Sequence, residues 1–175
     1  APNRPSPPAR LSFACLIMSE APNEKPGYDP SQVILYKRSR FQSRLPKDRL
    51  YTPSHFWLLQ IEPGFWRVGF TRFATRMLGD MVEHGFEVKP GDEIKVGQSI
   101  GWLEGFKALT DLFSAIDGSF VGTNPELEQD STLVDKDPYH KGWLFLARGA
   151  PDPNSTDVNG YIGVLDATID KMQSS

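Results

Sequence analysis

The residue in this sequence with the clearest chemical use is Lys107, which lies between two runs of alternating apolar residues. The runs cover residues 94–103 and 109–121, with a turn expected at Asp117-Gly118. Alternation of period two bounded by glycine and aspartate is typical of β-strands. We therefore expect Lys107 at the tip of a β-hairpin, where rigid strands hold its ammonium group in solvent. The plainer interpretation is an ordinary hydrated lysine.

Further elements must position this hairpin. Pro63-Gly64 predicts a turn between two strands. Thr71 is suited to cap a helix that Gly79 ends in a left-handed conformation. The expected elements are strands at residues 55–59, 66–70, 81–88 and 142–146, a helix at residues 71–79 and an amphipathic C-terminal helix at residues 161–172.

Composition excludes several classes of protein. The 175 residues suffice for one domain with extensions, and the formal charge of −3 argues against nucleic acid as a partner. The single cysteine, Cys15, cannot form an intramolecular disulfide, and no apolar run is long enough to span a membrane. The sequence has no phosphate-binding glycine loop, zinc-spaced Cys/His set or nucleophile elbow, so we expect neither catalytic residues nor a metal site.

A basic segment precedes the expected domain. Its cationic residues are Lys37, Arg38, Arg40, Arg44, Lys47 and Arg49. One interpretation is a docking patch for an acidic partner. The other is a solvated extension that packs beside the domain.

The following motifs occur in this order: Tyr51-x-x-x-His55-x-Trp57, Val68-Gly69-Phe70-Thr71-x-Phe73-Ala74 with Leu78-Gly79-Asp80, Glu104-x-x-Lys107-Ala108-x-x-Asp111, and Asp137-Pro138-Tyr139 with Gly142-Trp143-Leu144. Together they resemble the glycine cleavage H-protein family of lipoyl carriers. The resemblance covers residues 51–146, and it suggests a divergent member with an N-terminal extension. It implies a mainly β fold, a flattened β-barrel or sandwich of the lipoyl/biotinyl carrier type with a few short helices.

The resemblance also implies a function. Lipoic acid would be attached in amide linkage to Lys107, which would shuttle an aminomethyl group from glycine decarboxylase to aminomethyltransferase. Dihydrolipoyl dehydrogenase and a lipoyl-attaching enzyme would be the other partners. The chain would then be a non-catalytic, monomeric carrier without nucleic-acid or membrane partners. It would be cytoplasmic in a bacterium, or mitochondrial if residues 1–19 are the remnant of a leader.

The domain division follows the same resemblance. We expect an N-terminal extension at residues 1–50, a lipoyl-carrier domain at residues 51–148, and a linker with the C-terminal helix at residues 149–175.

Three residues around the lysine have two interpretations each. Glu104 and Asp111 are taken as recognition or orientation residues, or alternatively as charges that keep the hairpin soluble. Phe106 occupies a position where the family usually has a smaller residue. It is either a partner contact or a ring folded under the hairpin as core.

Other functions stay open. A lipoyl carrier for another pathway, such as sulfur oxidation, usually lacks the Lys-Ala-x-x-Asp continuation found here. An unmodified interaction module would not need to keep Lys107. A biotinyl carrier usually has methionines on both sides of its lysine, and Phe106 and Ala108 do not match.

Overall fold

The computed structural model describes residue 29 and residues 31–174. Predictions that concern residues 1–28, including the leader at residues 1–19, lie outside the described residues. The described chain is mainly β, as predicted, and every paired strand is antiparallel. Among the described residues, no helix is both long enough and apolar enough to cross a membrane.

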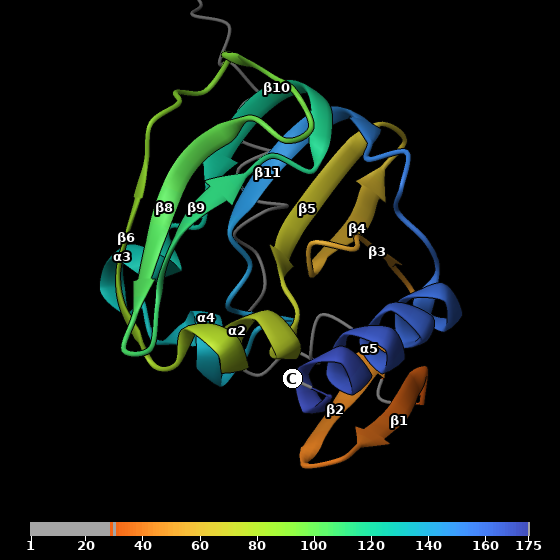
Figure 1. Ribbon diagram of the computed structural model, residues 1–175. Coiled ribbons are helices and arrows are strands. Elements are labelled where there is room, and N and C mark those ends of the chain that lie inside the picture. Colours follow the sequence, from red (N-terminus) through yellow and green to blue (C-terminus); the bar gives the residue numbers. More distant parts are fainter. Residues whose placement is uncertain (1–28, 30, 175) are drawn as a thin grey trace, which may run out of the picture.

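Two sheets face each other in the manner of a sandwich (Figure 1). The larger sheet contains, in spatial order, β3 (Leu50–Tyr51), β4 (Phe56–Glu62), β5 (Phe65–Phe70), β11 (Phe145–Pro151), β10 (Ile116–Thr123) and β7 (Glu93–Ile94). The smaller sheet contains β6 (Met81–Phe86), β8 (Ser99–Gly105) and β9 (Leu109–Phe113). Apolar side chains from both sheets, such as Ile100 and Phe120, belong to one buried cluster, which holds the layers together.

Within the described residues, a two-stranded sheet and four helices complete the fold. The strands are β1 (Val33–Arg38) and β2 (Phe41–Pro46), and the helices are α2 (Arg72–Leu78), α3 (Glu126–Gln129), α4 (Leu133–Lys136) and α5 (Val158–Gln173). Figure 1 shows that the β1–β2 hairpin and α5 lie side by side at one end of the sandwich, near α2. The helix predicted at residues 161–172 is confirmed. Compared with the prediction, α5 begins three residues earlier and ends one residue later.

Most of the expected turns and caps are present. Gly64 has φ 73° in the turn between β4 and β5, where only glycine adopts positive φ without strain. The Thr71 hydroxyl accepts a hydrogen bond from the amide of Ala74 and so caps α2. Gly79 ends this helix with a positive φ of 77°, as predicted, but its ψ of −168° is extended and lies outside the left-handed helical region. The extended ψ leads the chain directly into β6.

The turn predicted at Asp117-Gly118 is also wrong. Both residues lie inside β10, where Gly118 pairs with Gly149 of β11. A Cβ on Gly118 would lie 1.9 Å from the carbonyl oxygen of Arg148, so glycine is needed here for close approach of two strands. The break between the hairpin and β10 comes earlier, at Ser114, whose hydroxyl donates to the Ile116 carbonyl and accepts from its amide.

The final strand departs furthest from its predicted bounds. β11 starts at Phe145 rather than residue 142 and continues to Pro151. The division of the chain at residues 50 and 148 stays a prediction.

The C-terminal helix is fixed to the sandwich by aromatic residues. The rings of Tyr51 and Tyr161 stack at 4.8 Å with an interplanar angle of 8°. The Tyr161 hydroxyl lies 2.8 Å from Nδ1 of His55 and 2.7 Å from the hydroxyl of Thr71. This three-residue link joins the start of β4, the cap of α2 and the first turn of α5.

Burial of His55 makes the stability of this link depend on pH. Burial lowers the pKa of His55 from its ordinary value of 6.5 to about 4. Below pH 6.5 the unfolded chain binds a proton that the folded protein binds only near pH 4, so acidification favours unfolding. We expect the free energy of unfolding to fall by up to about 3 kcal/mol between pH 6.5 and 4.

Urea unfolding of the protein and of a His55→Asn variant across this range measures the effect. Asparagine tolerates the positive φ of 72° at this position and does not titrate. The variant should lose this part of the pH dependence, and an equal slope in both proteins would show that His55 is not responsible.

Candidate site at the Lys107 hairpin

Lys107 lies at the tip of the hairpin formed by β8 and β9, as the sequence predicts. The amide of Gly105 donates to the carbonyl of Ala108 at 2.8 Å and closes the turn. The Lys107 side chain is exposed, whereas Leu103 and Leu112 on the same two strands are completely or almost completely buried. The lysine therefore projects from strands that are held firmly by the core.

The tip of the hairpin is docked on the C-terminal end of α2. The amide of Lys107 donates to the carbonyl of Leu78 at 2.8 Å, and the amide of Phe106 donates to the carbonyl of Asp80 at 2.9 Å. The last carbonyls of a helix have no partner inside the helix. The amide of Lys107 supplies a partner for the last carbonyl of α2, and in return the helix fixes the position of residue 107.

Two glycines permit this contact. A Cβ on Gly79 would lie 2.9 Å from Cγ of Lys107, and a Cβ on Gly105 would lie 2.2 Å from the carbonyl oxygen of Leu78. A side chain at either position would push the hairpin and the helix apart. The absence of side chains there allows the two main chains to approach each other.

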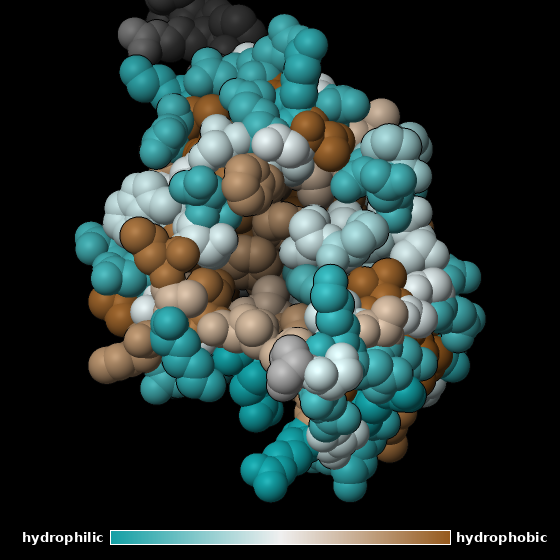
Figure 2. All heavy atoms as spheres, viewed as in Figure 1, coloured by the Kyte–Doolittle hydropathy of each residue, from teal (hydrophilic) through white to brown (hydrophobic). Residues whose placement is uncertain are grey.

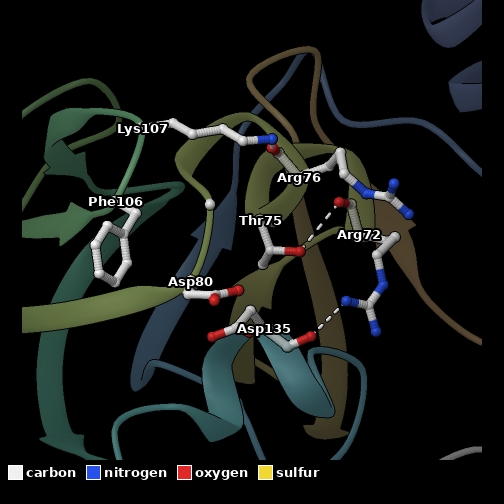
Figure 3. Close-up of a pocket in the computed structure, with 8 residues that line it drawn as sticks. Arg72, Thr75, Arg76, Asp80, Phe106, Lys107 and Asp135 are labelled. Atoms are coloured by element: carbon white, nitrogen blue, oxygen red, sulfur yellow. Dashed lines mark hydrogen bonds between the residues drawn. The ribbon is translucent and has the colours of Figure 1, made fainter.

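The amine of Lys107 extends over the end of α2. Figure 3 shows its side chain directed toward the carbonyl of Arg76, and Nζ lies 3.4 Å from that oxygen. A cation near a helix C-terminus is favoured by the helix dipole. A contact of 3.4 Å on an exposed side chain is weak, so the amine remains accessible for reaction.

A cleft of about 230 Å³ lies beneath the lysine. It is lined by Arg72, Thr75, Arg76, Gly79, Asp80, Phe106, Lys107 and Asp135. In Figure 3 the carboxylates of Asp80 and Asp135 lie on the opposite side of the cleft from the lysine. Cations and carboxylates thus share one small space beside the exposed amine.

The walls of this cleft are held by contacts between elements distant in sequence. A guanidinium nitrogen of Arg72 donates to the main-chain carbonyl of Asp135, and the Asp135 carboxylate accepts from the amide of Met81 at 3.1 Å. These bonds join α2 and α4 to the start of β6.

The sequence-predicted neighbours of Lys107 are all on the exposed surface. Phe106 is 82% exposed, so its predicted alternative as a core residue is wrong. Glu104 pairs with Leu109 and Trp102 pairs with Asp111, so both carboxylates occupy the same face of the hairpin. Neither carboxylate forms an ion pair within residues 29 and 31–174.

An apolar recess lies on the other side of the tip. It measures about 300 Å³ and is lined by His55, Phe70, Phe73, Ala74, Met77, Leu78, Ala108, Leu109 and Thr110. Figure 2 shows a hollow with an apolar floor between the strands above α2. The site therefore combines an exposed amine with a polar cleft and a neighbouring apolar surface.

Sequence reasoning missed the polar cleft. Gly79 is predicted only as the end of a helix and, with Asp80, as part of the motif that carries the resemblance, and the sequence does not single out Arg72, Arg76 and Asp135. Helical spacing would have placed Arg72 and Arg76 on one face of α2. No local pattern relates Asp135 to a lysine 28 residues earlier.

Comparisons with known proteins agree on one family. The family model described as glycine cleavage H-protein matches residues 49–157. The chain is 35% identical over 130 residues to the glycine cleavage system H protein of Pseudoalteromonas atlantica, covering 71% of this chain and 92% of that protein. It is 36% identical over 125 residues to the one from Bacteroides fragilis, covering 70% of this chain and 98% of that protein.

A solved structure leads to the same group of proteins. The crystal structure of a glycine cleavage system H protein from Mycobacterium marinum aligns with a TM-score of 0.61 at 30% identity, covering 68% of this chain and 97% of that chain.

The docking of the hairpin on α2 is open to a direct test. A Gly105→Ala change forces a methyl group against the Leu78 carbonyl, and we expect it to reduce the free energy of unfolding by about 2 kcal/mol. Gly122→Ala in β10 is the matched control, because a Cβ there meets nothing within 4 Å. Urea unfolding of both variants measures the difference. Equal stability of the two would show that the close approach is not required.

Proposed function

This chain belongs to the glycine cleavage H-protein family, and on that premise we propose that it carries lipoic acid in amide linkage to Lys107. We further propose that it moves an aminomethyl group from glycine decarboxylase to aminomethyltransferase. The protein itself is then a carrier and not a catalyst.

The observation that carries this proposal is the position of Lys107. Its amine is exposed, while its own main-chain amide is bonded to Leu78 at 2.8 Å. A carrier must present an arm at a defined place to several enzymes in turn. A main-chain anchor with a free side chain meets that need, because the anchor sets the position and the side chain gives reach.

The residues around the tip fit a lipoyl arm. Such an arm is an apolar chain that ends in a disulfide ring, and the recess lined by Phe70, Phe73 and Met77 offers it an apolar surface beside Lys107. When bound, the lipoyl group supplies the redox-active disulfide that takes up and releases the aminomethyl group.

The side chains of this protein would orient the arm rather than react. Attachment to Lys107 tethers the arm, which raises its effective concentration at each docked enzyme. Besides the two enzymes above, dihydrolipoyl dehydrogenase and a lipoyl-attaching enzyme would have to reach the tip. We assign recognition by these enzymes to Phe106, Glu104 and Asp111, which surround the lysine on the exposed surface.

The proposal predicts a modification at one residue. The intact mass of the protein purified from its own cells should exceed the sequence mass by one lipoyl group, and Lys107→Arg should abolish the increment. Lys95→Arg is the matched control, because Lys95 is also exposed but lies in the loop after β7. An unmodified mass in cells whose other lipoyl proteins are modified would leave an interaction module instead.

The pathway needs a second measurement. The modified protein should support exchange of labelled carbon dioxide into glycine by glycine decarboxylase, and the Lys107→Arg protein should not. A modified protein that fails in this exchange would be a lipoyl carrier for another system.

Phe106 should matter for recognition and not for folding. Because the ring is 82% exposed, Phe106→Ala should change the free energy of unfolding by less than about 0.5 kcal/mol. We expect it to raise the KM of at least one partner enzyme for the carrier without changing kcat. Unchanged kinetics with every partner enzyme would remove Phe106 from the recognition surface.

A further inference from the structure

A groove of about 630 Å³ separates the β1–β2 hairpin from the segment that follows α4. Its lining residues are Leu35, Tyr36, Lys37, Gln42, Ser43, Arg44, Arg72, Lys136, Asp137, Pro138 and Tyr139. The hairpin forms one wall, and it precedes the range of residues 49–157 that matches the family. The groove is therefore made partly by a segment outside that range.

The lining of this groove, here called the basic groove, is strongly cationic. Lys37 and Arg44 belong to the hairpin, Arg72 to α2 and Lys136 to α4, and only Asp137 brings a negative charge. None of the four cations forms an ion pair within the described part of the chain. By contrast, Arg38 on the same hairpin is paired with Asp166 and Asp170 of α5. Figure 2 shows hydrophilic side chains gathered over this end of the molecule.

The floor of the basic groove is rigid and uncharged. The Tyr36 hydroxyl donates to the Asp166 carboxylate at 2.7 Å, and the Tyr139 hydroxyl accepts from the amide of Arg72 at 3.0 Å. Burial raises the pKa of Tyr139 above its ordinary value, so this hydroxyl stays protonated. Pro138 adds an apolar surface, and Leu35 is 76% exposed at the edge.

These features favour an extended acidic segment over a compact anion. A phosphate site gathers donors at one point, usually main-chain amides and bidentate arginines. Here the cations come from four different elements and are not gathered at one point. Distributed charge over an aromatic and aliphatic floor suits a peptide with alternating acidic and apolar residues.

Arg72 also lines the cleft beneath Lys107, so the basic groove and the lysine site share a wall. We propose that the basic groove is a docking site for an acidic segment of an enzyme that acts on Lys107. This inference rests on the proposed function, because it takes its partner from among the enzymes that must reach the lysine. Docking in the groove would place such an enzyme beside the tip.

The test reverses charge in the groove without touching the site. Lys37→Glu/Arg44→Glu changes two exposed side chains of the hairpin, and Lys89→Glu/Lys95→Glu is the matched control in the loops on either side of β7. Dissociation constants are measured for each lipoylated protein with glycine decarboxylase, aminomethyltransferase, dihydrolipoyl dehydrogenase and the attaching enzyme of the same organism. A fluorescent peptide of alternating glutamate and leucine serves as a second probe.

We expect the groove variant to bind at least one enzyme, and the peptide, about tenfold more weakly than the control variant, with a smaller dependence on salt. Equal binding of both variants to all four enzymes would overturn the proposal. Displacement of the peptide by inorganic phosphate, at a comparable total concentration of negative charge, would also overturn the proposal. It would favour a small-anion site instead.

The readouts separate this inference from the proposed function. Intact mass reports lipoylation of the groove variant, and glycine exchange at saturating carrier reports the competence of Lys107. The groove variant could be lipoylated, active at saturating concentration and as tightly bound to the enzymes as the control variant. That result would contradict the docking proposal and leave the proposed function intact. A native protein that is never lipoylated would contradict the proposed function. The peptide probe would still decide whether the basic groove binds acidic segments.

Discussion

The structure depends on one contact between main chains, where the β8–β9 hairpin meets the end of α2. A helix leaves its last carbonyls without internal partners, and a hairpin tip leaves amides free. Bonds from Lys107 to Leu78 and from Phe106 to Asp80 satisfy both needs at once. Gly79 and Gly105 remove the side chains that would keep these groups apart. Because both elements pack into the buried core, the tip is held in a fixed position relative to the sandwich.

Local signals predicted much of this architecture. The Thr71 cap, the Gly64 turn and the period-two runs around Lys107 are each set by residues close in sequence, so the helix and the hairpin could be placed in advance. The turn at Asp117-Gly118 failed for a non-local reason. Gly118 is needed because β11 approaches β10 closely, and that requirement is invisible without the partner strand.

The candidate site was predictable in its centre and not in its surroundings. Lys107 was identified from a motif, whereas the cleft beneath it brings together α2, α4 and the hairpin from separate parts of the chain. The contact between β1 and the C-terminal helix α5 was likewise not predictable from either segment. Tyr36 and Arg38 of β1 bind Asp166 of α5, which lies 130 residues after Tyr36, and neither segment alone indicates the other. A basic stretch that looked like an extension is thereby attached to the fold.

The main-chain anchor of the tip has an evolutionary consequence. Apart from the two glycines, no side chain at the tip is needed to keep residue 107 where it is. Selection could therefore rewrite the neighbouring positions, including the one now occupied by Phe106, without moving the lysine. Related proteins could therefore differ in the surface that they present around the hairpin tip, while the lysine keeps its position in space.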